Sequence, residues 1–239
     1  RGATGAGHTA ATQRASGSVV RGSRRPRSRA TVPLGCRRGA IPSRHDGVAM
    51  QIRVAYTVEQ CWHPSPGGTA IAALRIAREL ASFTDDVELH FVAGKHPIAP
   101  VAEFRPSGAV AMLPLARPAL YEAWTRLNWP KVESVTGEID VAHATGPVPC
   151  GAAAPLAVTV HDLAFVHDPA KFSRQGVRTM NRSLSAIIRR ADRVIVSSEA
   201  TRRDCEAAGI AADRLRLVPL GVDVVKVSTD AAERIRRRY

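Results

Sequence analysis

The chain is poor in cysteine, in lysine and in long apolar runs. Its four cysteines, Cys36, Cys61, Cys150 and Cys205, are far apart in the sequence and form no CxxC pair. This spacing argues against a disulfide framework and against a zinc site, and it favours a reducing compartment. No stretch of roughly 18 or more apolar residues occurs, so we expect no membrane span and at most a peripheral membrane contact.

Positive charge is concentrated at one end of the chain. Residues 1–49 contain ten arginines and one acidic residue, Asp46, and so carry most of the net charge of +13. The segment has no aromatic residue and no apolar period of 2 or 3.6 residues, which predicts disorder. The whole chain has only four lysines among its 34 basic residues, a bias expected of GC-rich coding.

Three explanations compete for residues 1–49. An arginine-rich arm could bind nucleic acid or anionic lipid, a leader poor in acidic residues is typical of targeting peptides, and translated upstream DNA would have no function at all. The chain begins with Arg1, and Met50 directly precedes a well-formed strand pattern, MQIRVAYT. These features favour the third explanation, and we do not expect nucleic-acid binding.

Residues 50–223 are expected to form one α/β domain, a Rossmann-like parallel sheet flanked by helices, with 224–239 beginning a further element. Short apolar runs rich in β-branched residues alternate with helical patterns, as in βαβ units. We predict strands at 51–57, 87–93, 109–115, 139–144, 156–160, 193–196 and 215–218. Helices are predicted at 69–83, 119–135 with a stop or kink at Pro130, 173–190, 199–208 and 229–239.

Small and polar residues follow several of these strands, where ligands bind in open α/β sheets. The loop Pro66-Gly67-Gly68-Thr69 stands between a strand and a helix, and its glycines would let a diphosphate or a sugar hydroxyl approach the helix N-terminus. A plain tight turn with Thr69 as the N-cap is the alternative. The loop is neither a GxGxxG fingerprint nor a P-loop.

His161 and Asp162 end the run AVTV. The histidine could bind a substrate hydroxyl or serve the fold, and the aspartate could orient the chain or cap the next turn. His143 and His167 lie after strands or in loops, and His143 is a candidate for binding the donor or the acceptor. The spacing of these histidines gives no recognisable metal-ligand set, and we expect no metal.

Two further candidates are Ser198 with Thr201, and Gly221. Ser198 and Thr201 follow a strand and suit a helix N-cap as well as a ligand site. Gly221, in the turn PLGVD, is expected to allow a positive φ angle, either at a ligand loop or at a linker.

As an ordered set, these motifs resemble a known family. The succession PGGTAIAALRIAREL, DVAHATG, AVTVHDLAF, ADRVIVSSEATRRDC and RLRLVPLGVD is similar to the N-terminal domain of family 4 retaining glycosyltransferases of the GT-B fold, which include bacterial mannosyltransferases of cell-envelope and polysaccharide assembly. The resemblance spans residues 50 to about 223.

The resemblance assigns roles to individual residues. It implies that Gly67 and Gly68 face the donor diphosphate and the acceptor, and that His161 touches the transferred sugar. His161, with Asp162 beside it, is the candidate catalytic pair. Ser198 and Thr201 would begin a helix near the interdomain cleft. The PLGVD turn would lead into residues 224–239, an interdomain linker and the start of a truncated second domain. In this family that domain supplies an Arg/Lys pair and an EX7E element.

The resemblance also implies an activity. It predicts transfer of a mannose-like hexose from a nucleotide-sugar donor to a carbohydrate or lipid-linked acceptor, with retention of configuration and without cofactor or metal. The chain ends at Tyr239, before the second-domain motifs, so we expect the 239 residues alone to be inactive. A cytoplasmic location is implied, with possible peripheral contact at the inner face of the membrane.

Other interpretations remain open. The same strand-end residues could form a stand-alone module that binds a nucleotide or phosphosugar without catalysis. The loop 95–108 or the helix 119–135, with Trp124 and Trp129, could shape an acceptor site, although both tryptophans also suit core packing. The basic, apolar helix 173–190 could touch anionic lipid or simply present a solvated face.

Overall fold

A computed structural model describes residues 51–83, 85–222 and 228–239. The predictions for residues 1–50, including Met50, and for Asp223 lie outside these ranges. The described strands are β1 (Ile52–Thr57), β2 (Val87–Ala93), β3 (Val110–Met112), β4 (Val141–Ala144), β5 (Leu156–Val160), β6 (Arg193–Val196) and β7 (Leu215–Leu217).

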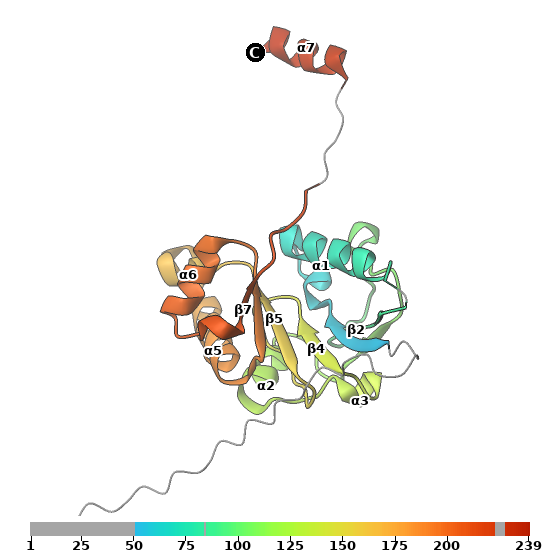
Figure 1. Cartoon of the computed structure of the whole chain (residues 1–239), viewed down its shortest axis with the longest axis vertical. Helices are drawn as coiled ribbons and strands as arrows, with labels where there is room; N and C mark the ends of the chain where they lie inside the picture. Colours follow the sequence, from blue (N-terminus) through green and yellow to red (C-terminus); the bar gives the residue numbers. More distant parts are fainter. Residues whose placement is uncertain (1–50, 84, 223–227) are drawn as a thin grey trace, which may run out of the picture. The chain divides into compact units, whose positions relative to one another are not determined.

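Helices separate most of these strands (Figure 1). The α-helices are α1 (Gly67–Leu80), α2 (Ala119–Leu127), α3 (Glu133–Thr136), α4 (Ala164–His167), α5 (Arg174–Arg190), α6 (Glu199–Ala207) and α7 (Thr229–Arg238). Short 3₁₀ turns are η1 (Glu59–Trp62), η2 (Ala102–Phe104), η3 (Pro169–Lys171) and η4 (Ala212–Arg214).

The strands form one parallel sheet in the order β3-β2-β1-β4-β5-β6-β7. The predicted Rossmann-like fold is therefore confirmed. After β1 the chain steps outward to β2 and β3, and after β4 it steps in the opposite direction to β5, β6 and β7. The boundary between β1 and β4 is thus a topological switch point, and open α/β sheets bind ligands at the carboxyl ends of strands beside such a point.

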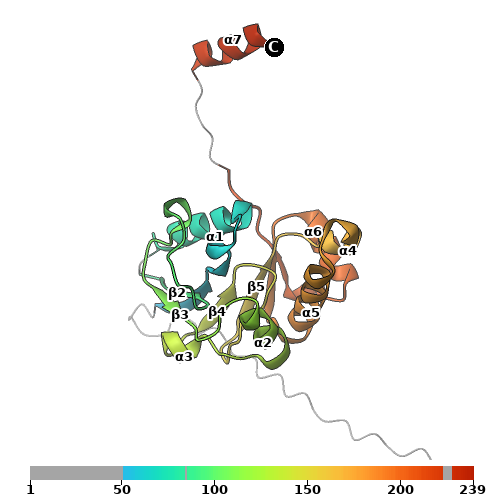
Figure 2. The same cartoon turned by 180° about the vertical axis from the view of Figure 1, so that it is seen from behind.

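Each face of the sheet has its own apolar core. Ala55 and Tyr56 are neighbours in β1, so their side chains point to opposite faces. Tyr56 packs with the small residues of α1, while Ala55 belongs to the cluster that contains Trp124 of α2 and Ile187 of α5. Accordingly, α1 and the pair α2 and α5 cover different faces, and Figure 2 shows α2 beside α5.

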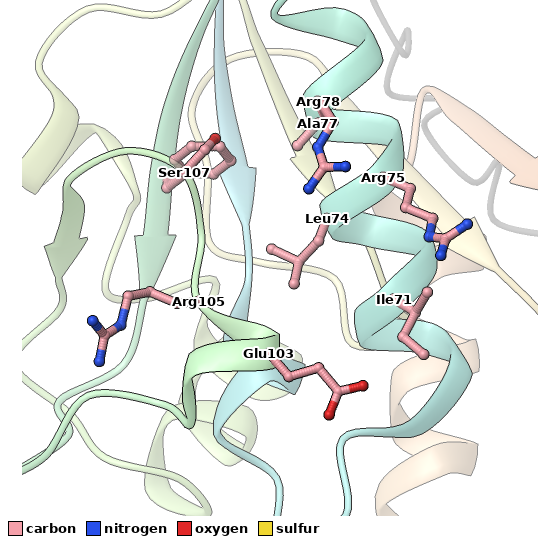
Figure 3. Close-up of a pocket in the computed structure, with 9 residues that line it drawn as sticks. Ile71, Leu74, Arg75, Ala77, Arg78, Glu103, Arg105 and Ser107 are labelled. Atoms are coloured by element: carbon pink, nitrogen blue, oxygen red, sulfur yellow. The ribbon is translucent and has the colours of Figure 1, made fainter.

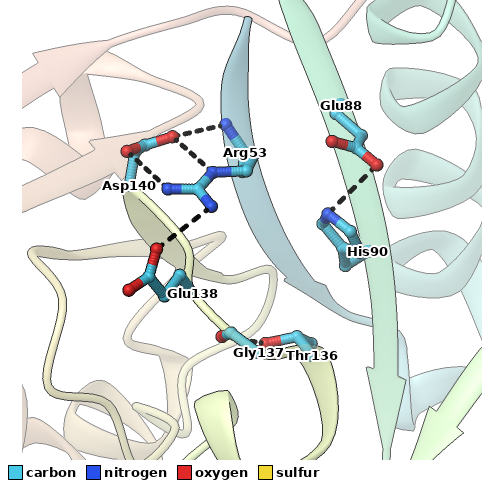
Figure 4. A network of polar contacts seen from close by, with 7 residues as sticks. All are labelled: Arg53, Glu88, His90, Thr136, Gly137, Glu138 and Asp140. Atoms are coloured by element: carbon cyan, nitrogen blue, oxygen red, sulfur yellow. Dashed lines mark hydrogen bonds and ion pairs between the residues drawn. The ribbon is translucent and has the colours of Figure 1, made fainter.

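Hydrogen bonds and ion pairs join the start of β1 to the start of β4 at the amino edge of the sheet (Figure 4). Asp140 accepts hydrogen bonds from the backbone nitrogen of Arg53 at 2.8 Å and from its Nε at 3.3 Å, and Glu138 lies 3.6 Å from the same guanidinium. The backbone N–H and the guanidinium of Arg53 lower the pKa of Asp140. These contacts hold β1 and β4, the strands on either side of the switch point, in register at their amino ends.

Two predicted elements are much shorter than expected. The strand predicted at 109–115 is reduced to Val110–Met112, at the sheet edge. The helix predicted at 119–135 ends at Leu127, because Asn128 adopts a left-handed conformation with φ of 54° two residues before Pro130. Trp124 is buried in the core and donates its Nε1 hydrogen to the carbonyl of Pro130, which excludes it from an acceptor surface.

Helix α5 is less basic on its surface than its sequence indicates. Arg182 binds Glu122, and Arg190 donates to the carbonyl oxygens of Trp124 and Cys150. These contacts fix α5 to α2 and take two of its arginines away from solvent. Within the described ranges, moreover, none of the helices combines the length and the apolar character that crossing a bilayer demands.

Candidate functional site at the carboxyl edge of the sheet

Buried threonines join β1 to β4 at the switch point. The backbone nitrogen of Thr145 donates to Thr57 Oγ1 at 3.2 Å, and the Thr145 hydroxyl donates to the carbonyl of Thr57. Gln60 Nε2 donates to Thr145 Oγ1 at 2.6 Å. All three side chains are buried, and each hydrogen bond satisfies a polar group that would be costly to bury alone. These hydrogen bonds join the ends of β1 and β4 at the carboxyl edge of the sheet.

His161 directly follows β5 and contacts Thr145. Its Nε2 is 3.3 Å from the carbonyl oxygen of Thr145. A carbonyl can only accept, so the neutral imidazole carries its hydrogen on Nε2 and leaves Nδ1 as an acceptor. No described residue forms a hydrogen bond with Nδ1, and the side chain is partly exposed. This nitrogen can accept a hydrogen bond from a ligand hydroxyl.

The backbone of His161 is held by the start of α6. Thr201 Oγ1 donates to the carbonyl of His161 at 3.0 Å, and Ser197 Oγ donates to the same oxygen at 3.3 Å. Ser198 is the N-cap of α6, because its hydroxyl accepts from the backbone nitrogen of Thr201 at 3.1 Å. The cap interpretation is confirmed, and Thr201 also positions His161.

His143 belongs to β4, and its side chain contacts Thr159 of β5 and the ring of Tyr56 in β1. Its Nε2 is 2.9 Å from Thr159 Oγ1, and its ring meets the ring of Tyr56 edge-on with centroids 5.1 Å apart. Burial lowers its pKa to about 4, with a smaller contribution from the charge of His161. His143 is therefore neutral near pH 7, and its Nε2 is occupied by Thr159.

The glycine loop opens α1 at the same edge of the sheet. Gly67 has φ of +59°, and neither Gly67 nor Gly68 has a neighbouring atom within 4 Å of the place where a Cβ would stand. The helix begins at Gly67 rather than Thr69, and its N-cap position, Pro66, makes no side-chain cap bond. The first-turn N–H groups thus have no side-chain cap at the positive end of a 14-residue helix, and the space beside the two glycines is open, a setting that suits an anion.

Three predictions at these motifs need correction or a narrower interpretation. Thr69 is not the N-cap, because its hydroxyl lies inside the first turn and donates to the carbonyl of Pro66 at 3.4 Å. Gly221 does not have a positive φ angle. Asp162 is exposed and accepts from the backbone nitrogen of Ala164 at 3.0 Å, which makes it a cap of the α4 turn.

A second polar cluster at this edge was missed by the sequence analysis. Glu59 is buried after β1, accepts from the backbone nitrogen of Gly94 at 2.7 Å and lies 3.1 Å from His96 Nε2. The ring of Trp62 stacks on the ring of His96 with centroids 4.7 Å apart. The sequence signal that could have revealed this cluster is Glu59, a carboxylate just after a strand. Its partner His96 follows a different strand, β2, so the pair is not visible from local sequence.

The cluster continues toward α2. His63 Nε2 lies 3.3 Å from the hydroxyl of Tyr121, and Arg117 donates to the carbonyl of Trp62 at 3.4 Å. Burial, together with the charges of Arg117 and His96, lowers the pKa of His63 to about 4. Arg117 and Tyr121 also line a hollow of about 340 Å³ between α2 and α5.

Another hollow, of about 220 Å³, lies between α1 and the segment that begins at η2 (Figure 3). Arg75 and Arg78 extend from α1, and Glu103, Arg105 and Ser107 come from the segment that begins at η2. None of the strand-end residues lines it. In the described part of the chain, no three His, Cys, Asp or Glu side chains are grouped in a way that could hold a metal ion.

Comparison with solved structures finds similar chains of low identity. The crystal structure of Anabaena Alr3699/HepE in complex with UDP and glucose matches with 18% identity and a TM-score of 0.49, covering 79% of this chain and 50% of that one. The Alr3699/HepE complex with UDP-glucose gives 18% and 0.48. A putative UDP-N-acetylglucosamine 2-epimerase from Listeria monocytogenes gives 11% identity and 0.45, covering 70% of this chain and 44% of that one.

This chain therefore spans about half the length of the solved structures it matches. A comparison with curated proteins finds no match. The family model described as Glycosyltransferase Family 4 matches residues 66–226, about two thirds of the chain, and includes the glycine loop, His161 and the α6 cap. The chain belongs to Glycosyltransferase Family 4.

Proposed function

We propose that the described domain is the acceptor-side half of a retaining glycosyltransferase. The reaction would move a mannose-like hexose from a nucleotide-sugar donor to an acceptor hydroxyl. One observation carries the proposal: His161, with Nδ1 open, and the uncapped N-terminus of α1 lie at the same edge of the sheet, beside its switch point. Family membership supports the reaction class.

The two features suit different parts of a nucleotide sugar. The N–H groups of the first turn of α1 can stabilise negative charge, which grows on the diphosphate as the glycosidic bond breaks. Nδ1 of His161 can accept from a sugar hydroxyl and so orient the ring. The missing Cβ atoms of Gly67 and Gly68 leave room for a phosphate against the backbone.

This domain would contact the donor from one side only. We propose that groups of a second domain bind the nucleotide and complete the charge stabilisation, so that the 239-residue chain alone binds ligands without turnover. A cytoplasmic location, with peripheral contact at the inner face of a membrane, belongs to the same proposal. The exposed arginines that remain on α5 for such a contact are Arg174, Arg178 and Arg189.

A transfer assay tests the function. The longest gene product that contains this chain is incubated with GDP-mannose or UDP-glucose and a cell-envelope acceptor extract, and release of nucleoside diphosphate is followed. We expect transfer with retained anomeric configuration by NMR, and its loss in His161→Ala. Binding without turnover in that longest product would instead favour a stand-alone binding module. Steady turnover by the 239 residues alone would contradict the proposal that a second domain is needed for transfer.

A further inference from the structure

We propose that the hollow between α2, α5 and the segment after β4 binds the acceptor, and that Arg117 selects an acceptor carrying an anionic group. This inference rests on the proposed function and adds to it the chemical class of the acceptor. Arg117 would be a specificity-determining residue, since it meets the anion rather than the atoms that react.

The position of the hollow fits this role. Helices α2 and α5 follow β3 and β5, so their first turns lie at the carboxyl edge of the sheet, where the strand-end residues gather. The lining includes Arg117 and Tyr121 at the start of α2, Gly176 and Met180 on α5, and Val148 from the segment after β4. The volume, about 340 Å³, lies within the range of small-ligand sites.

Arg117 gives the hollow a net positive charge. Across the described ranges, no ion pair joins Arg117 to a carboxylate, and its guanidinium donates to the carbonyl of Trp62. Glu122 also lines the hollow, but its carboxylate is neutralised by Arg126 at 2.9 Å and by Arg182. His63, close by, stays neutral because its pKa is about 4. A guanidinium without an acidic partner suits a carboxylate or a phosphate.

The surroundings of Arg117 hold it in place. Its Nη2 donates to the carbonyl of Trp62, whose ring stacks on His96, and His96 in turn binds the buried Glu59. A cation fixed in this way loses little freedom when it binds an anion. The rest of the lining includes Val148, Met180 and the ring of Tyr121, so the anionic group should be joined to a less polar portion.

Equilibrium binding to the 239-residue chain tests the proposal without requiring transfer. Three matched probes share one aglycone and one sugar ring: phenyl β-D-glucoside is neutral, phenyl β-D-glucuronide carries a carboxylate, and phenyl β-D-glucoside 6-phosphate carries a phosphate. We expect an anionic probe to bind about tenfold more tightly than the neutral probe, as for a hydrogen bond to a charged group. The better of the two anions identifies the acceptor group.

Four variants distinguish loss of the Arg117 charge from loss of the fold. Arg117→Gln should abolish the preference for the anion, Arg117→Lys should keep part of it, and Met180→Trp should weaken all three probes by filling the hollow. Arg189→Gln is the matched control, because it removes one exposed charge near the far end of α5 and should keep the preference. Circular dichroism checks that each variant is folded.

Two results would overturn the proposal. One is equal affinity of the native chain for all three probes, and the other is an anion preference that survives in Arg117→Gln. If Arg117→Gln fails to fold, unchanged binding in Met180→Trp would reject the site. Transfer only to neutral acceptors would contradict this inference and leave the proposed function standing. Anion binding by the hollow without any transfer would contradict the proposed function, and with it the acceptor role of the hollow, and would leave only the anion site.

Discussion

The Nε2 atom of His161 lies 3.3 Å from the carbonyl oxygen of Thr145, and the two residues follow the neighbouring strands β5 and β4. This contact selects one tautomer of the neutral ring and leaves Nδ1 as the acceptor. Thr145 is itself fixed to Thr57 across the switch point. The orientation of the imidazole is thus set by the hydrogen bonds that close the sheet at this edge.

The two ring nitrogens can be tested separately. An amide nitrogen in His161→Gln stands near the place of Nε2, and the amide in His161→Asn stands near Nδ1. If Nδ1 meets the sugar, Gln should lose transfer as fully as Ala, about 10²-fold or more in kcat, while Asn should keep a measurable part. Initial rates with the longest gene product give the comparison, and equal activity of Gln and native protein would reject the assignment.

The two glycines of the α1 loop should respond differently to alanine. Gly67 has φ of +59°, so Gly67→Ala should cost roughly 1 kcal/mol of stability or somewhat more. Gly68 has no positive φ and open space at its Cβ position, so Gly68→Ala should change stability by less than about 0.5 kcal/mol. Thermal unfolding measures both.

Ligand binding should be weakened by both alanines, because each methyl group fills space beside the N–H groups of α1. Binding of inorganic pyrophosphate, followed by calorimetry, is a suitable readout. A Gly68→Ala chain that is stable and binds pyrophosphate as the native chain does would show that the loop is only a turn.

Stability should fall between pH 6.5 and pH 4 because of His143. Its pKa is about 4 in the folded chain and about 6.5 when unfolded, so the unfolded state takes up the proton first as the pH falls. The contribution is fully present above pH 6.5, is lost on the way down to pH 4 and changes no further below it. Its size is on the order of 2–3 kcal/mol.

Urea unfolding at several pH values checks this slope. His143→Gln should show a shallower decline, and His63→Gln should remove a further share, since its pKa is also about 4. Ile187→Val is the control, because it weakens the core by about 1 kcal/mol at every pH and leaves the slope unchanged. A His143→Gln chain with the native slope would contradict the prediction.

The parts predicted from sequence are those whose signals are local. The strands at 87–93, 156–160 and 193–196 match the structure residue for residue, because β-branched runs in a buried parallel sheet end abruptly at polar residues. Ser198 was identified as a cap for the same reason, since its role depends on a residue three positions away.

The parts that were missed depend on the order of strands in the sheet. Glu59, His96 and Arg117 follow β1, β2 and β3, and they gather only because these strands are neighbours. The start of α1 was placed two residues late, because a threonine is the better cap in sequence terms. Gly67 instead takes the first position of α1 with a positive φ angle, a backbone conformation that the pattern of cap residues does not predict.

Arg214 should be among the more important arginines for stability. Its Nη1 donates to the carbonyl of Ile188 at 2.8 Å, and its Nη2 donates to Ile187 at 2.9 Å and to Ala191. It thereby gives donors to three carbonyl groups at the C-terminal end of α5, of which that of Ile187 also accepts from the backbone nitrogen of Ala191 at 3.0 Å. Arg214→Ala should cost about 1–3 kcal/mol, and Arg214→Lys should cost less because one carbonyl keeps a donor.

Arg216 is the matched control, because its Nη1 bonds only to nearby carbonyls of Asp213 and Leu215 and the residue is exposed. Arg216→Ala should change stability by less than about 0.5 kcal/mol. Equilibrium urea unfolding gives both values, and hydrogen exchange at the last turn of α5 adds a local readout. If the two alanine variants were equally stable, the carbonyls at the end of α5 would have to be satisfied by water instead of the Arg214 guanidinium.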